Sequence, residues 1–349
     1  MTVVQDLRMR FVAAALVVAA GASLVLAGDE APRRGRSVRI EAPRRVEVQV
    51  PAGSFTQGVS EDLATATEQQ CKIAFYPPDQ VPSVTTAAGI TIDFCGEYAD
   101  ELRHMQQRRV SLDAFMIDRD EVSVADYRAC IDAGGCTLDA LIAGDERYIR
   151  GDWPIVNVTW DEAVTYCAWR GARLPTEAEW ERAARGDGKD DVTLDQENDW
   201  PWGEIERPTD FNHGQARAVA MRQIERQLIS LPLRFFGDPD DSDGHAFLAK
   251  PGSYPWGESP YGTRDQAGNV AEWTADSHYR DQTKLGYEGL SSHNPLREGT
   301  NASPRVVRGG SWRQPAFLAR SNLRDPFNLI YDPTKRYSHV GFRCARTIR

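Results

Sequence analysis

The chain has 349 residues, of which 41% are hydrophobic and 26% charged, so it can fill a core and is not typical of a disordered protein. It carries 41 basic against 51 acidic side chains, a net charge of −10. This acidity argues against nucleic-acid binding, which needs clustered positive charge. A single long apolar stretch excludes a polytopic membrane protein.

That apolar stretch lies at the N-terminus, over residues 11–27, and follows Arg8 and Arg10. A basic start, an apolar middle and small residues at the end predict a secretory signal peptide over residues 1–27, with an uncleaved N-terminal anchor as the alternative. Both interpretations predict an extracytoplasmic protein that is periplasmic, secreted or anchored by residues 11–27. The Pro- and Arg-rich residues 28–45 predict a linker.

Ordered structure is expected to start with a strand at residues 45–50, where β-branched residues alternate. Residues 59–107 hold two cysteines and mixed polarity, and we interpret them as an insertion. Capping signals then predict three helices, beginning after Ser123, Thr159 and Thr176. The third is expected to end near residues 182–185, before Gly186.

Turn signals dominate from residue 200 onward, including two Pro-Trp-Gly triplets at residues 201–203 and 255–257. A second insertion is expected at about residues 214–242, with one possible helix over residues 217–230. The pattern as a whole predicts an α+β fold with few long elements and many loops. Its six cysteines favour disulfides over zinc, because no CxxC pair occurs, but six cysteines allow 15 connectivities.

Seven segments of the chain together resemble the formylglycine-generating enzyme, or sulfatase-modifying factor, family. They follow the family's order over residues 46–349, and the most specific are RLPTEAEWE (173–181), GNVAEW (268–273) and RGGSW (308–312); the last segment is VGFRCAR (340–346). The resemblance implies one domain over residues 46–349, with an irregular, loop-rich fold related to C-type lectins.

The resemblance also implies a disulfide between Cys167 and Cys344. We then pair Cys130 with Cys136 because they are close in sequence, and Cys71 with Cys95 because they remain. Buried free thiols are the alternative for some of the six.

Calcium is the cofactor that the resemblance implies, because two loops match the family's calcium sites. In the first, Asp265 and Glu272 would give side-chain oxygens, and Gly268 and Val270 backbone carbonyls. The second set is Asn212, His213, Asp243 and His245. The alternative for residues 238–244 is a solvated acidic turn, and an EF-hand is rejected because Lys250 stands where a bidentate Glu is required.

This chain differs from the family's oxidases at the two positions that bind copper. The family's oxidases bind copper(I) through two cysteines after RGGS, and those positions are Gln314 and Ala319 here. Neither residue offers the soft sulfur that copper(I) needs, so copper is not expected. Ser311 stays at a substrate-pocket position of the family, with a structural turn serine as the alternative.

Other catalytic interpretations find little support in the sequence. The iron-binding histidine motif of the sulfoxide-synthase relatives is absent, and Arg313 stands where a GxSxG nucleophile motif needs Gly. Nothing in the sequence places His278, His293 or His339 beside Ser311. The charged residues Glu177, Glu179, Glu181 and Arg182 are expected to be structural, through capping and ion pairs.

Two hypotheses on function follow from these observations. The first is an exported accessory or ligand-recognition protein whose groove binds a peptide, protein or glycan, without nucleic-acid contact and with membrane contact only through an uncleaved N-terminal segment. The second is an oxidative enzyme that modifies a protein or a metabolite, either of the formylglycine-generating type or a non-copper relative. Ser311, Gln314 and Arg320 are its first candidate residues.

Overall fold

The computed structural model describes residues 45–75, 84–85, 91–142, 148–187, 198–214, 242–245, 247–278, 286–300, 302–326 and 331–348. All of them lie in one compact unit, Ile40–Arg349. The expected signal segment, almost all of the linker and the possible helix at 217–230 lie outside the described residues. Within those residues, no helix is both long enough and apolar enough to cross a membrane.

The centre of this unit is a three-stranded sheet in the order β8–β7–β9. Its strands are Arg305–Arg308 (β8), Ala271–Ser277 (β7) and Val340–Gly341 (β9). Strand β7 pairs antiparallel with β8 and parallel with β9, and it is buried along nearly its whole length. Ala271 and Trp273 of β7 join the main apolar core, whereas the alternate residue Glu272 forms a buried ion pair.

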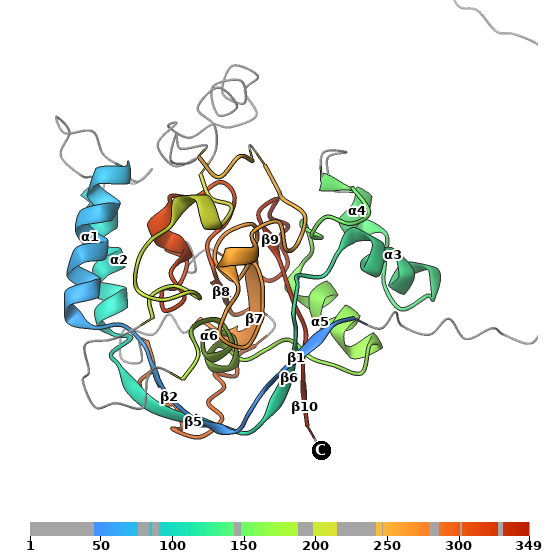
Figure 1. The fold of residues 1–349 in the computed structure, drawn as a ribbon, viewed down its shortest axis with the longest axis horizontal. Coiled ribbons are helices and arrows are strands. Elements are labelled where there is room, and N and C mark those ends of the chain that lie inside the picture. The colour runs from blue at the N-terminus through green and yellow to red at the C-terminus, as the bar shows by residue number, and fades with distance from the viewer. Residues whose placement is uncertain are drawn as a thin grey trace, which may run out of the picture. The chain divides into compact units, whose positions relative to one another are not determined.

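A second three-stranded sheet, β1–β6–β10, lies near the C-terminus (Figure 1). Its strands are Glu47–Val50 (β1), Phe115–Asp118 (β6) and Ala345–Thr347 (β10), with both outer strands antiparallel to β6. The strand expected at residues 45–50 is therefore confirmed. The other described strands form two antiparallel two-stranded sheets. Gly53–Gln57 (β2) pairs with Arg108–Leu112 (β5), and Val84–Thr85 (β3) pairs with Thr91–Ile92 (β4).

The three predicted helices are confirmed, together with their start signals. They are Val124–Asp132 (α3), Trp160–Trp169 (α5) and Glu177–Arg185 (α6). At each start, the side chain of the capping Ser or Thr accepts a hydrogen bond from the backbone N–H three residues later. The acidic side chain at that later position accepts a hydrogen bond from the backbone N–H of the capping residue. Helix α6 ends at Gly186, whose φ of 79° favours glycine. The remaining short elements are Asp139–Ile142 (α4) and the 3-10 turns Pro208–Asp210 (η2), Pro255–Gly257 (η4) and Ala316–Ala319 (η5).

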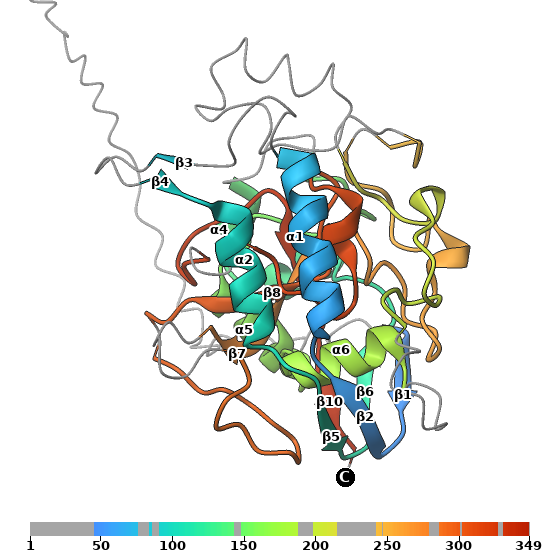
Figure 2. The same ribbon diagram turned by 90° about the vertical axis from the view of Figure 1, so that its left-hand side faces the viewer.

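The insertion at residues 59–107 contains a pair of helices that the sequence analysis did not predict, Glu61–Phe75 (α1) and Phe94–Arg103 (α2). Figure 2 shows them side by side, and in Figure 1 they lie on the opposite side of the central sheet from α3 and α5. Leu63 and Leu102 pack in one apolar cluster with Phe317, Leu318 and Leu323. The helix pair therefore covers the segment that follows the RGGSW motif.

Three disulfides cross-link this unit, and they are the three pairs expected from the sequence. Cys71–Cys95 joins α1 to α2, Cys130–Cys136 closes the turn after α3, and Cys167–Cys344 joins α5 to the segment before β10. Since the chain has six cysteines in all, none is left as a thiol.

Candidate functional site

The two positions that correspond to the copper ligands lie in the covered segment after RGGSW. Gln314 is buried, and Ala319 packs so closely on Gly310 that a Cβ on this glycine would lie 2.9 Å from the Ala319 Cα. All six cysteines are in disulfides, so the chain has no thiolate to offer. Copper(I) therefore does not fit this site, because it needs soft sulfur ligands.

In place of a thiolate pair, the segment holds a short chain of buried polar side chains. The Ser311 hydroxyl donates to Gln314 Oε1 at 2.7 Å, and Gln314 Nε2 donates to Asp325 Oδ2 at 2.7 Å. The structure thus brings two of the candidate residues together and adds Asp325, which no sequence motif indicated. Because each amide and hydroxyl group has a fixed partner, the arrangement also suits a structural role for Ser311.

Arg320, the third candidate, points elsewhere. Its Nη1 donates to Gln70 Oε1 of α1 at 2.6 Å, and its guanidinium lies 5.5 Å from the ring centre of Trp200. Gln70 also lines a cavity of about 300 Å³ between α1 and η5, together with Ile73, Ala74, Glu206 and residues 315–317. This cavity is a concave surface where the first hypothesis would place a ligand.

None of the three histidines considered earlier contacts Ser311 among the described residues. His278 Nε2 pairs with Glu101 at 2.7 Å, and His293 is exposed. His339 Nε2 lies 2.9 Å from the Tyr331 hydroxyl, and burial lowers the pKa of His339 well below its usual value, with Arg313 lowering it further. The His339 imidazole is therefore neutral at physiological pH.

The first expected calcium loop forms a sharp turn before β7. Asp265 Oδ2 accepts from the Gly252 backbone at 2.6 Å, and burial raises the pKa of Asp265 to about 7. Glu272, however, is fully engaged: Arg343 donates to both of its oxygens at 2.7 Å, and Trp180 Nε1 donates to one at 2.8 Å. This bidentate ion pair was not expected from the sequence.

The residues of the second expected set also lie close together. Asp243 accepts from the backbones of His213 at 2.9 Å and His245 at 3.0 Å. Asn212 donates to Asn269 Oδ1 at 3.0 Å, which joins this set to the first loop. The Oδ1 atom of Asn212 is buried and has no hydrogen-bond partner among the residues that the structure describes.

An unpaired buried amide oxygen and a buried carboxylate fit a hard cation such as calcium. In the described part of the chain, no group of three or more His, Cys, Asp or Glu side chains could hold a metal ion. A cation here would therefore depend on backbone carbonyls and amide oxygens as well as carboxylates, which calcium accepts and which transition metals favour less.

The charged residues of α6 form a buried network, as expected for a structural role. Glu177 binds Arg324 through two hydrogen bonds of 2.6 and 2.7 Å and binds Arg308 at 3.2 Å. Glu181 binds Arg308 at 2.7 Å and Arg185 at 3.1 Å. The network holds α6 against β8 and the 320–325 segment.

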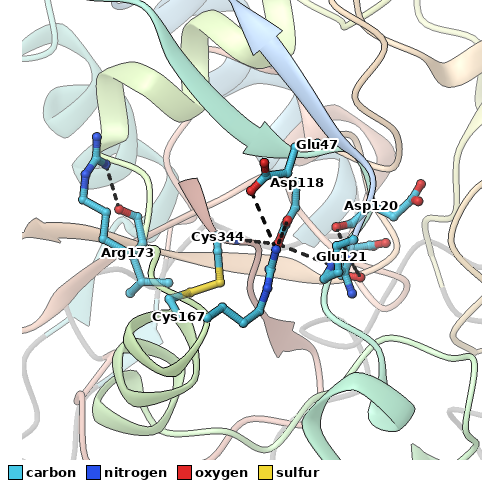
Figure 3. The surroundings of a disulfide bond; sticks show 10 residues. Glu47, Asp118, Asp120, Glu121, Cys167, Arg173 and Cys344 are labelled. Atoms are coloured by element: carbon cyan, nitrogen blue, oxygen red, sulfur yellow. Dashed lines mark hydrogen bonds and ion pairs between the residues drawn. A yellow bond between two sulfur atoms is a disulfide. The ribbon is translucent and has the colours of Figure 1, made fainter. Parts of the chain in front are cut away.

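A further group of charges surrounds the Cys167–Cys344 disulfide (Figure 3). Asp118 is fully buried and accepts from Arg170 at 2.7 and 3.0 Å and from the Cys344 backbone at 3.0 Å. Figure 3 also shows Asp120 and Glu121, which follow β6. This side of the molecule is therefore fixed by a cross-link and a buried ion pair together.

The fold and the site together define a loop-rich α+β domain, cross-linked by disulfides, with acidic loops beside its central strand and no thiol pair. The chain matches the FGE-sulfatase family, the sulfatase-modifying factor enzyme 1-like domain, over residues 36–348. It belongs to this family.

Relatives with different names match this chain at similar identity. It is 31% identical over 195 residues to the bovine (Bos taurus) inactive C-alpha-formylglycine-generating enzyme 2, covering 56% of this chain and 50% of that protein. It is 32% identical over 200 residues to the formylglycine-generating enzyme of Thermomonospora curvata, covering 56% of each. It is 30% identical over 268 residues to the hercynine oxygenase of Mycolicibacterium smegmatis, covering 68% of this chain and 54% of that protein.

The chain spans about half the length of these curated relatives. Among solved structures, PvdO from Pseudomonas aeruginosa is similar with a TM-score of 0.53 and 24% identity, covering 86% of this chain and 94% of that one. This likeness supports the fold.

Proposed function

We propose that this chain is an exported, disulfide- and calcium-stabilised member of the family that recognises a ligand and does not oxidise cysteine with copper. The observation that carries the proposal is the absence of any free thiol in the chain, with Gln314 and Ala319 at the copper positions. The similarity to relatives named inactive supports the same direction.

A ligand-binding role is supported by the cavity between α1 and η5. Its wall combines apolar side chains with Gln70 and Glu206, and ligand sites in general combine an apolar lining with a few polar groups. Gln70, Ile73 and Ala74 of its lining belong to α1, so the insertion contributes directly to the proposed site. Export is supported by the N-terminal pattern and by the three disulfides, which persist in oxidising compartments.

The test is to incubate the purified protein with a Cys-containing sulfatase-type peptide, copper and oxygen, and to follow the peptide by mass spectrometry. We expect no aldehyde product and, by metal analysis, calcium without copper or iron. An active formylglycine-generating enzyme serves as the positive control. The variant Gln314→Cys/Ala319→Cys is the matched control, because restoring the thiols should increase copper(I) binding. Aldehyde formation by the unmodified chain would refute the proposal.

The second candidate is an oxidative enzyme with another mechanism. It is favoured by the similarity to hercynine oxygenase and by the buried Ser311–Gln314–Asp325 chain at the position of the lost copper site. Stoichiometric iron or copper in the purified protein would favour this candidate over ligand recognition.

A further inference from the structure

The three most exposed large apolar side chains among the described residues lie at the cavity between α1 and η5 or on the turns beside it. Ile73 of α1 lines the cavity and is 81% exposed. Ile205, next to the lining residue Glu206, is 73% exposed, and Trp256 of η4 is 75% exposed. Exposed apolar groups that gather in one place mark interaction surfaces. We call these three residues and the cavity lining the cavity surface.

The turn that carries Ile205 packs against η4. Trp202 Nε1 donates to the Ile205 carbonyl at 2.8 Å, and the Trp202 ring stacks on Trp200 with ring centres 5.5 Å apart. A Cβ on Gly257 of η4 would lie 3.7 Å from the Trp202 ring and 2.6 Å from the Asp210 carbonyl oxygen. The turn and η4 therefore pack as one unit, which places their exposed side chains on neighbouring backbone.

Three carboxylates of the same turn, Asp199, Glu204 and Glu206, share one guanidinium. Arg320 Nη2 lies 4.0 Å from Glu206, and Arg320 Nε lies 3.7 Å from Asp199. The third nitrogen of Arg320 donates to Gln70 on the cavity wall at 2.6 Å. Burial raises the pKa of Asp199, and the charge of the exposed Glu204 acts in the same direction.

The other cations nearby are already paired with carboxylates. The pairs are Arg185 with Glu181 at 3.1 Å, Arg207 with Asp210 at 3.5 Å and Lys72 with Glu68 at 2.6 Å. The cavity surface therefore combines exposed apolar groups with negative charge that no described side chain fully balances. A neutral glycan would leave this charge unbalanced, and an acidic peptide would be repelled by it.

We propose that the cavity surface binds a segment of a partner polypeptide that carries basic side chains among aliphatic ones. Its aliphatic side chains would enter the cavity against Ile73 and Phe317, and its basic side chains would pair with Glu204 and Glu206. The inference rests on the proposed ligand recognition and names the chemistry of the ligand. Apolar contact supplies most of the affinity, whereas charge complementarity selects the partner.

The test measures peptide binding to the full chain by fluorescence anisotropy. The probe is a dye-labelled, end-blocked ten-residue peptide with three lysines and three leucines among glycines and serines. One comparison peptide replaces the lysines with glutamates, and the other replaces the leucines with serines. The melting temperature of each protein variant shows that it is folded.

Two sets of variants separate the charge from the apolar contact. Glu204→Gln/Glu206→Gln removes the charge, and Glu288→Gln/Glu298→Gln, its matched control, removes two exposed acids from another loop. Ile73→Ser removes apolar contact, and Leu138→Ser, at a residue that is 54% exposed outside the cavity surface, is its control.

We expect the basic peptide to bind and both comparison peptides to bind at least about tenfold more weakly, because each lacks one of the complementary features. Glu204→Gln/Glu206→Gln should weaken the basic peptide about fivefold at low ionic strength and less at high ionic strength. Ile73→Ser should weaken it about tenfold. Both control variants should bind like the wild type.

Equal affinity for the basic and acidic peptides, or no binding of the basic peptide, would overturn this inference. An equal effect of Glu288→Gln/Glu298→Gln would also overturn it, because it would assign binding to the net charge of −10. None of these results would alter the proposed function, since the aldehyde assay and the metal analysis test it separately.

Two other occupants of the cavity surface have their own readouts. A dimer in light scattering that Ile73→Ser dissociates would assign the surface to a second copy of this chain. Tighter peptide binding after Arg217→Gln/Arg222→Gln/Arg226→Gln would assign it to a basic segment of the chain itself. Either result would overturn the assignment to a partner polypeptide.

Discussion

Gly268, in the first expected calcium loop, packs against the backbone of Asn212 in the second expected set. Its φ is +79°, and a Cβ at this position would lie 2.1 Å from the Asn212 carbonyl oxygen. Gly268→Ala should therefore lower the free energy of unfolding by roughly 2 kcal/mol or more, from the left-handed backbone and the clash together. Urea unfolding measures this. Gly151→Ala is the control, since a Cβ there meets no atom within 4 Å, and an equal loss in both variants would contradict the explanation.

Glu177 is a buried carboxylate whose ionised form is stabilised by two arginines. Burial acts to raise the pKa of Glu177, but Arg324 and Arg308 outweigh it, so this pKa lies below its usual value. Because the pKa of Glu177 is lower in the folded than in the unfolded state, ionised Glu177 stabilises the folded protein. This stabilisation is complete above the unfolded-state pKa of about 4.3, and it is lost as the pH falls through the folded-state pKa.

Glu177→Gln should therefore cost about 3–5 kcal/mol at neutral pH, because it removes the carboxylate that pairs with the buried Arg324 guanidinium and leaves Arg308 with Glu181 alone. The difference from the wild type should shrink as the pH falls below 4, which urea unfolding at several pH values can measure. The exposed Glu298→Gln is the control and should show little effect at any pH. A difference that stays constant with pH would assign the effect to packing.

At the scale of the elements, the helices that begin with a capping box were predictable and the central strands were not. Ser123, Thr159 and Thr176 each give a local signal, because the cap and the acid three residues on contact each other directly. Strand β7 gives no such signal: it is buried on both faces and still contains Glu272 and Asp276, whose partners come from distant segments. Its sequence therefore lacks the alternation by which strands are recognised.

In the candidate site, too, some residues could be predicted from the sequence and others could not. The resemblance to the family indicated Ser311 and Gln314, and it grouped Asn212 with Asp243 as one expected calcium set. The Asn269–Glu121 contact and the Arg343–Glu272 pair join segments that are 148 and 71 residues apart, and Asp325 lies 11 residues beyond Gln314 with no motif to indicate it. Only the folded structure brings these side chains together.

The capping boxes lead to a prediction for the helices. Thr176→Ala should lower the free energy of unfolding by about 1 kcal/mol, because the Glu179 backbone N–H loses its acceptor. Thr65→Ala, in the exposed middle of α1, is the matched control and should be neutral or slightly stabilising, since Ala is the better helix former. Chemical denaturation compares the two. Equal effects would show that the cap contributes nothing beyond the loss of a side chain.

At the scale of the whole molecule, the three disulfides restrict the unfolded chain to very different degrees. They span 6 residues at Cys130–Cys136, 24 at Cys71–Cys95 and 177 at Cys167–Cys344. Loop entropy predicts losses of about 2, about 3.5 and about 5 kcal/mol when each pair is replaced by alanines. The longest also joins α5 to the segment beside the central strands, so its removal should lower the melting temperature of the entire domain.

Removing Cys71–Cys95 should, by contrast, first loosen α1 and α2, because this bond lies within the helix pair. Limited proteolysis distinguishes the two cases: early cleavage within residues 61–103 is expected for Cys71→Ala/Cys95→Ala, and cleavage throughout the domain for Cys167→Ala/Cys344→Ala. All three double variants lose the same side-chain atoms, so their comparison isolates the effect of the span. A ranking that does not follow the span would mean that native packing around each bond outweighs the entropy of the unfolded chain.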